Sequence, residues 1–287
     1  MPDRLVPLDL TSAEHTNRLL LLIGAATRSD GQPPFSDQSL VDLRAGVRVG
    51  TGIEIDGVIS GISIMTTDAG PTEAEFVVSP VCRHRGLGAR LLADVMERSG
   101  GRVVIWAHGD HPDARSLAAR AGLEPVRELL QLRLSPVHAP GGAAEVRAFR
   151  PGTDDAEWLA LNALAFADHA EQGSLTQADL GARTAEPWFD PADFLIASGD
   201  DGAMTGFCWL KVEDGIGEFY AVGVSPTAQG RGLGRGLVGA GLARLAERGV
   251  IESSLYVEAD NTAAVSLYRS VGFTDHSIDI QYAATAG

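Results

Sequence analysis

The sequence has few cysteines, and their spacing excludes two common uses of that residue. Cys82 and Cys208 are the only two among 287 residues. They stand in different halves of the chain and have neither CxxC nor metal-ligand spacing, which argues against a zinc site and against a disulfide framework. We therefore expect two reduced thiols, a cytoplasmic location and no bound metal.

Positive charge is also scarce. The chain has 23 Lys and Arg against 38 Asp and Glu, for a net charge of −15. Non-specific binding to nucleic acid or to an anionic membrane relies on surplus basic residues, so neither partner is expected. A small polyanionic ligand stays open, because backbone amides can bind it locally.

Long apolar runs are missing as well. No stretch reaches 18 apolar residues, which excludes a transmembrane helix. The apolar segment 19–26 follows acidic and polar residues instead of a basic region, which argues against a signal peptide. We expect a monomeric cytoplasmic protein that acts on small molecules.

What the chain does contain is a repeat. Pro80 and Pro226 stand in matching Val-Ser-Pro segments 146 residues apart, and the glycines Gly122 and Gly272 lie 150 apart. The length fits two domains, and half of the chain can bury its own core. A Pro- and Gly-rich segment separates the halves. We predict domains at 1–136 and 145–287, joined by a linker at 137–144.

Each half has the same order of elements. The apolar pattern predicts leading helices, then strands, and then a glycine turn, a helix, a strand, a helix and a final strand. The helices are expected at 15–28, 36–45, 154–168 and 176–185, and the strands at 47–55, 58–66, 74–78, 103–107, 145–149, 193–197, 202–212, 217–224 and 254–258. This order predicts an α/β (α+β) fold, with a mixed sheet and helices on both faces.

The glycine turn of the second half has the properties of a phosphate site. A strand runs into Gln229-x-x-Gly-x-Gly234, and an apolar helix follows. Glycines let successive N–H groups converge at the positive end of the helix dipole, which favours a pyrophosphate. Arg231 and Arg235 would add charge. A plain tight turn is an alternative, whereas a dinucleotide loop fits neither the glycine spacing nor the position within the domain.

Two motifs together carry a family resemblance. Val224-Ser-Pro226 with the loop 229–234, and the later segment 255–273, resemble the two signatures of the Gcn5-related N-acetyltransferase superfamily. The resemblance implies acetyl-CoA as co-substrate. The implied cofactor contacts are Phe76, Val77, Val78, His84, Arg85, Gly86, Leu87, Gly88, Ala89, Val222, Gly223, Val224, Gln229, Gly230, Arg231, Gly232, Leu233, Gly234, Arg235, Asn261, Thr262, Ala263, Ala264, Val265 and Ser266.

The candidate catalytic residues lie in the second half. Transfer of an acetyl group to an amine needs a base for the amine and an acid for the departing thiolate. We assign these roles to Glu218 and Tyr268. The constant offsets place Thr72 and Ala118 at these positions in the first half.

The first half has lost the cofactor-contacting asparagine as well. His111 replaces Asn261, and Arg83 replaces Gln229 in the glycine loop. We therefore expect the first half to bind acetyl-CoA or to brace the substrate without catalysing transfer. We interpret His108 and His111 as loop histidines.

Four further segments, 106–109, 127–131, 166–173 and 187–191, resemble the mycothiol synthases, a family of tandem acetyltransferases. That resemblance implies acetylation of the cysteinyl amine of a cysteine–glucosamine–inositol conjugate, the last step of mycothiol synthesis. It implies substrate contacts at Asp37, Glu171, Lys211, Glu218 and Tyr256, with Asp37 supplied by the first domain to close the cleft. The alternatives are an acetyltransferase for an aminoglycoside or a peptide N-terminus, and a module that only senses acetyl-CoA.

Overall fold

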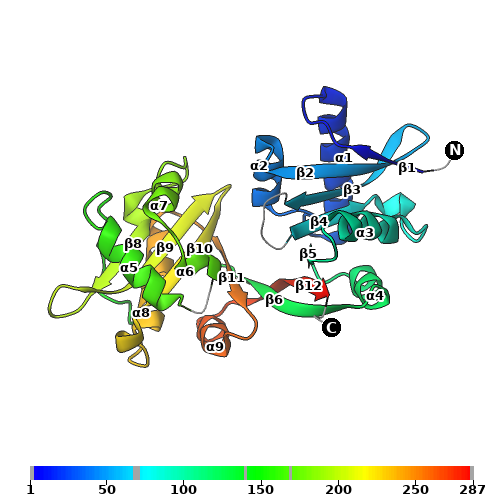
Figure 1. The fold of residues 1–287 in the computed structure, drawn as a ribbon. Coiled ribbons are helices and arrows are strands. Elements are labelled where there is room, and N and C mark those ends of the chain that lie inside the picture. The colour runs from blue at the N-terminus through cyan, green and yellow to red at the C-terminus, as the bar shows by residue number, and fades with distance from the viewer. Residues whose placement is uncertain (1–2, 67–71, 139–140, 168–169, 285–287) are drawn as a thin grey trace. The chain divides into compact units, whose positions relative to one another are not determined.

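The computed structural model describes residues 3–66, 72–138, 141–167 and 170–284 (Figure 1). Contacts divide the chain into two compact units. Within the described residues, unit 1 comprises 3–130, 258–260 and 277–284, and unit 2 comprises 131–257 and 261–276. No helix among these residues is long and apolar enough to span a membrane.

The two units exchange segments relative to the contiguous domains expected from the sequence. The last strand, β12 (Thr274–Ala284), gives its residues from Ser277 onward to unit 1. There Ile280 pairs with Ala107 at the end of β5. In return, residues 131–134 of β6 (Leu123–Leu134) belong to unit 2. The predicted boundaries at 1–136 and 145–287 stay a prediction about how the repeat is divided.

Unit 1 is a mixed sheet with helices on both faces. Its strands are β1 (Arg4–Pro7), β2 (Arg48–Ile55), β3 (Val58–Thr66), β4 (Thr72–Val78) and β5 (Val103–Ala107), followed by its parts of β12 and β6. α1 (Ala13–Asp30) and α2 (Asp37–Ala45) pack on one face through the cluster around Ile62 and Ile64. α3 (Leu87–Arg98) and α4 (Pro112–Arg120) cover the other face (Figure 1).

Unit 2 repeats this arrangement. Its strands are β7 (Arg147–Ala148), β8 (Phe194–Ser198), β9 (Met204–Glu213), β10 (Ile216–Val224) and β11 (Glu252–Glu258), with its parts of β6 and β12. Its helices are α5 (Asp155–Ala165), α6 (Ala170–Gly173), α7 (Gln177–Thr184), α8 (Leu233–Glu247) and α9 (Thr262–Ser270). α5 and α7 cover one face and α8 and α9 the other.

The predicted mixed sheet is confirmed by the strand directions. β10 runs antiparallel to β9 and parallel to β11. Under α5, the ring of Trp209 stacks on Phe194 at 4.3 Å, and the edge of Trp158 meets Trp209 at 5.6 Å. Aromatic pairs at such separations contribute about 0.5–1.5 kcal/mol beyond their burial, so this cluster fixes which face of β9 carries Trp209 and, two residues later, Lys211.

The short strands were the least predictable elements. The strand expected at 145–149 is reduced to β7, and β1 was not expected. β1 spans four residues that include Arg4 and Pro7, and it lies at the edge of the sheet, paired with β2. Such an edge strand has no apolar run for the sequence to reveal, because its partner supplies the stability.

Candidate active site

The second unit opens a gap between two parallel strands. β10 pairs with β11 from Ile216 to Phe219, where the pairing ends. β10 continues to pair with β9 as far as Val224. The backbone of Val222 to Val224, predicted to contact the cofactor, therefore lies beyond the point where the two strands diverge. Backbone groups beside such a gap can pair with amides of an extended ligand.

A β-bulge lies at the start of this gap. The register between β10 and β9 shifts between Phe219 and Ala221, so Tyr220 is an extra residue in the strand. Bulges re-aim the local backbone and are frequent beside active sites. Here the bulge places Tyr220 against Trp188 and Trp209 on the face covered by α5. The side chain of Glu218, two residues earlier, projects to the same face of the sheet.

The glycine loop follows β10 and runs into α8. Gly232 has φ 84° and ψ 1° immediately before the first residue of α8, a conformation that favours glycine. Gln229 Nε2 donates to the carbonyl oxygen of Val224 at 3.2 Å, which ties the loop to the strand end. Arg235 donates to Ser270 Oγ at 2.7 Å and so links α8 to α9. Free N–H groups at a helix start bind anions such as a pyrophosphate.

α9 carries the predicted acid and begins at the predicted cofactor contact. The side-chain oxygen of Asn261 accepts a hydrogen bond from the Ala264 N–H at 3.1 Å and caps the helix. Tyr268, on the same helix, is buried and its ring edge meets Phe273 at 5.9 Å. Burial, with a smaller effect from Cys208, raises the pKa of the Tyr268 phenol. The phenol is therefore protonated at neutral pH, as a proton donor must be.

The predicted base and two predicted substrate contacts share the opposite face. Glu218 pairs with Lys211 on β9 and with Ser254 on β11. Paired residues project to the same face of a sheet, and Tyr256 follows Ser254 by two residues. Lys211 Nζ lies 3.0 Å from Glu213 and 5.6 Å from the centre of the Trp188 ring. The Tyr256 hydroxyl accepts from Gln131 Nε2 at 2.8 Å, and the residue as a whole is 47% exposed.

Two of the substrate predictions concern side chains that the structure does not describe. Asp37 is the first residue of α2 in unit 1, and Glu171 lies within α6 in unit 2. Their side chains fall outside the described part of the chain. Their proposed contacts therefore stay predictions.

Unit 1 retains the glycine loop in nearly the same backbone conformation. Gly86 has φ 82° and ψ 0° before α3, against 84° and 1° for Gly232 before α8. Arg83 replaces Gln229 and likewise links the loop to the end of the preceding strand, because its Nε donates to the Val78 carbonyl oxygen at 3.2 Å. The Arg83 guanidinium also forms two hydrogen bonds with Asp30, at 2.7 and 2.6 Å. The anion-binding geometry of the loop is thus preserved without the original residue.

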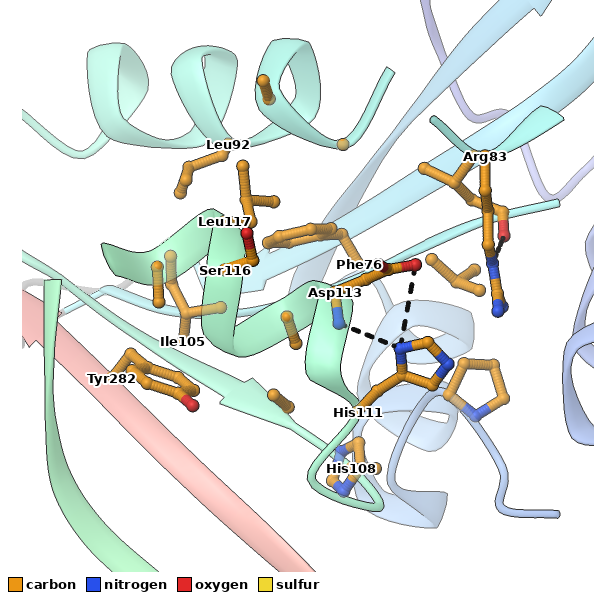
Figure 2. A pocket seen from close by; sticks show the side chains of 18 of the residues that line it. Phe76, Arg83, Leu92, Ile105, His108, His111, Asp113, Ser116, Leu117 and Tyr282 are labelled. Atoms are coloured by element: carbon orange, nitrogen blue, oxygen red, sulfur yellow. Dashed lines mark hydrogen bonds and ion pairs between the residues drawn. The ribbon is translucent and has the colours of Figure 1, made fainter. Parts of the chain in front are cut away.

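A cavity of about 370 Å³ lies beside this loop (Figure 2). It is lined by residues of β4, of the loop, of the start of α3, of β5 and of α4. Those of the first three segments are Phe76, Val77, Val78, Arg83, His84, Gly86, Leu87, Gly88 and Ala89. His111 caps α4, its Nδ1 accepting from the Asp113 N–H at 3.2 Å. It thus performs the capping role of Asn261 at the matching position. Most of the cofactor residues predicted for the first half therefore meet around one cavity.

The strand registers correct one prediction about the first half. The constant offset makes Thr72 the counterpart of Glu218, but the bulge in β10 adds one residue. Glu218 pairs with Ser254, which matches Val104, and Val104 pairs with Glu73. β4 has no bulge, so Glu73 is the true counterpart. Arg48 Nη2 holds Glu73 at 3.1 Å, an ion pair that engages this carboxylate.

His108 lies in the turn after β5, where a loop histidine was expected, but its side chain is largely enclosed, with 14% exposure. Its Nδ1 lies 3.0 Å from Asp279 and its Nε2 3.6 Å from Glu75. Glu75 accepts hydrogen bonds from the hydroxyls of Ser36 and Ser39 at 3.0 and 2.8 Å. The two carboxylates outweigh the effect of burial and raise the pKa of His108 to about 10. This group, here called the buried ion cluster, lies on the α1 and α2 face of β4, beside the gap between β4 and β5.

The buried ion cluster of unit 1 lies at the strand position that corresponds to the bulge of unit 2. Glu75 is the last residue of β4 that pairs with β5, and unit 2 has the bulge residue Tyr220 and Ala221 at this point. Among the residues that the structure describes, no group of three or more His, Cys, Asp or Glu side chains could hold a metal ion. The distances from His108 to Glu75 and Asp279 are those of ion pairs.

Comparison with known proteins identifies the class. The sequence model of the Acetyltransferase (GNAT) family matches residues 158–273. A GCN5-related N-acetyltransferase from Sphaerobacter thermophilus has the same fold over 98% of this chain and 96% of its own, with a TM-score of 0.81 at 23% identity. A tandem GNAT protein from the clavulanic acid biosynthesis pathway aligns over 98% of both chains, with a TM-score of 0.72 at 16% identity. The chain is an acetyl-CoA-dependent N-acetyltransferase built from tandem GNAT folds.

Curated relatives identify the family within that class. A mycothiol acetyltransferase from Clavibacter michiganensis is 47% identical over 92% of this chain and 90% of its own length. Another from Streptomyces griseus is 45% identical over 96% of this chain and 94% of its own. The chain belongs to the mycothiol acetyltransferase family.

Proposed function

We propose that the chain transfers the acetyl group of acetyl-CoA to the cysteinyl amine of desacetylmycothiol, the cysteine–glucosamine–inositol conjugate, in the last step of mycothiol biosynthesis. We propose that it does so as a monomeric cytoplasmic enzyme. The observation that carries the proposal is the gap between β10 and β11, with Glu218 on one face of the sheet and Tyr268 on the helix that covers the other. A thioester seated in this gap is reached by an amine from one side and by a proton donor from the other.

On the acceptor side, Glu218 takes the proton of the attacking amine, directly or through one water. An amine attacks only in its neutral form, and a carboxylate beside it removes the proton. The polar groups on this face suit a polyhydroxylated conjugate. Lys211 donates to hydroxyls. Glu171 and Asp37, whose side chains lie outside the described part of the chain, are proposed to accept from hydroxyls or from the cationic amine. The exposed ring of Tyr256 offers an apolar surface to a sugar or inositol ring.

On the cofactor side, the loop from Gln229 to Arg235 binds the pyrophosphate through backbone N–H groups. The diverging backbone of Val222 to Val224 pairs with the pantetheine amides and donates to the thioester carbonyl, where negative charge develops. The amide nitrogen of Asn261 contacts the cofactor arm, since its oxygen caps α9. Tyr268 then protonates the departing CoA sulfur.

Unit 1 binds acetyl-CoA in its cavity and does not catalyse transfer. The preserved loop and the cavity beside it support binding. Three features support the lack of catalysis. Ala118 replaces the phenol, Arg48 engages the carboxylate of Glu73, and the buried ion cluster fills the acceptor side. Each removes a different requirement of the reaction, so restoring one alone is not expected to restore activity.

The direct test is release of CoA from acetyl-CoA in the presence of purified desacetylmycothiol. We expect saturable release with this acceptor, and at least 10²-fold lower kcat/KM with an aminoglycoside or a peptide N-terminus, because polar pockets reject ligands that leave their groups unpaired. Release with one of the other amines alone would replace the proposed acceptor. Tight acetyl-CoA binding with no release for any amine would favour a sensing module.

Glu218→Gln keeps the shape of the side chain and removes its basicity. We expect kcat/KM for the acceptor to fall about 10²-fold near neutral pH, the low end for loss of a general base. The loss should shrink as pH rises, because hydroxide and the free amine replace the base. Steady-state rates from pH 6.5 to 9.5 measure this. Glu213→Gln, two residues from Lys211 on β9, is the matched control. A pH-independent loss in Glu218→Gln would indicate a binding role instead of base catalysis.

A further inference from the structure

The cavity of unit 1 extends beyond the cofactor contacts into the apolar core. Arg83 and His111 lie at one end, and Leu92, Ile105 and Tyr282 lie at the other (Figure 2). Ala118 and Leu123 also line the cavity. These last five residues all belong to the buried core between the sheet and helices α3 and α4. A cavity whose deep end is lined by core side chains is an apolar site that water occupies poorly.

Two of the residues that line this apolar end are smaller than their counterparts in the other half of the repeat. α4 and α9 have matching bounds, 150 residues apart, so Ala118 stands where α9 carries Tyr268. Leu123 likewise stands where unit 2 has Phe273. In unit 2 these two rings pack edge to face at 5.9 Å and are both buried. In unit 1 both rings are absent, and the smaller side chains line the cavity instead.

We propose that unit 1 is a binding site for CoA thioesters whose acyl chain is longer than acetyl, with propionyl to hexanoyl chains entering this apolar end. The proposal rests on the proposed binding of CoA by the unit 1 loop, and it names the acyl class that this site prefers. In unit 2, Tyr268 and Phe273 occupy the matching space and restrict the site to a short acyl group. The two units thus bind the same CoA moiety and select different acyl chains.

The physical reason is the burial of methylene groups. Each CH₂ removed from water into a preformed apolar cavity strengthens binding about fourfold. Butyryl-CoA, which has two more methylene groups, is therefore expected to bind unit 1 about 15-fold more tightly than acetyl-CoA. The gain should end where the chain outgrows the cavity. Free CoA should bind more weakly than acetyl-CoA, because it fills none of the apolar end.

The experiment is calorimetric titration of the full chain with CoA and with acetyl-, propionyl-, butyryl- and hexanoyl-CoA. Gly232→Val disables the unit 2 loop, because valine is strained at φ 84°, and so isolates the unit 1 site. On that background we expect one binding event whose affinity rises from acetyl to butyryl. With Ala118→Tyr added, the affinity for butyryl-CoA should exceed that for acetyl-CoA by no more than about twofold, while CoA itself still binds. Gly86→Val on the same background, strained at φ 82°, should abolish binding.

The outcomes separate the two proposals. Equal or weaker binding of butyryl-CoA in Gly232→Val, with CoA still bound, would overturn the acyl preference and leave the cofactor site intact. No binding of CoA or any thioester would overturn binding by unit 1 altogether. Titration of the unmodified chain keeps the test decisive if Gly232→Val fails to fold. We then expect butyryl-CoA to bind one site tightly, and Ala118→Tyr alone to remove that tight event. A butyryl-CoA isotherm unchanged by Ala118→Tyr would also reject the proposal.

Discussion

Tyr268→Phe is expected to lower the turnover number of acetyl transfer by about 10²-fold or more, with little change in the affinity for acetyl-CoA. The substitution removes a single hydroxyl and keeps the ring that packs against Phe273. In the proposed mechanism the cofactor is bound mainly by the loop and by backbone groups of β10, which this change does not touch. Steady-state kinetics with acetyl-CoA and desacetylmycothiol, together with calorimetric binding of acetyl-CoA, measure the two effects separately.

Cys208→Ala is the matched control for this prediction. The Cys208 thiol is fully buried and lies close enough to contribute to the raised pKa of Tyr268. Its removal creates a packing defect of similar location without removing the phenol, so turnover should stay within a few fold. An unchanged turnover number in Tyr268→Phe would remove Tyr268 from the mechanism. An equal loss in Cys208→Ala would mean that packing, and not the hydroxyl, matters there.

The buried ion cluster is expected to dominate the stability of unit 1. His108→Ala leaves the carboxylates of Glu75 and Asp279 buried without their shared cation, which should lower the free energy of unfolding by about 3–5 kcal/mol. His111→Ala removes only the exposed cap of α4 and should cost about 1 kcal/mol. Urea unfolding followed by circular dichroism at pH 6.5 compares the three chains. Similar losses in both variants would indicate that the cluster contributes no more than a helix cap.

The same cluster predicts a pH dependence of definite sign. The pKa of His108 is raised to about 10 in the folded protein, against about 6.5 in the unfolded chain. The protonated ring therefore contributes its full stabilisation below pH 6.5, and this is lost as pH rises towards 10. We expect the free energy of unfolding to fall between pH 6.5 and 10 in the unmodified chain and to vary less in His108→Gln. Parallel slopes in the two chains would contradict the assignment of this charge to His108.

The sequence determined the parts of the site that depend on local structure. The glycine loop was predictable because its left-handed positions and the helix that follows are encoded within a few consecutive residues. The substitution of Ala118 for Tyr268 was predictable for a similar reason. A helix has a fixed rise per residue, so a constant offset along α4 and α9 compares positions that are equivalent in space.

Tertiary structure alone decided the parts that depend on partners distant in the sequence. A bulge adds one residue without changing the composition of a strand, so only the pairing of β10 with β9 and β11 identified Glu73 as the counterpart of Glu218. The sequence also does not reveal that residues 277–284 belong to unit 1, because a strand can pair with any compatible sheet edge. His108 is a largely enclosed cation only because Glu75 and Asp279, from distant segments, lie beside it. A charge is buried only where such partners converge, and convergence is a property of the fold.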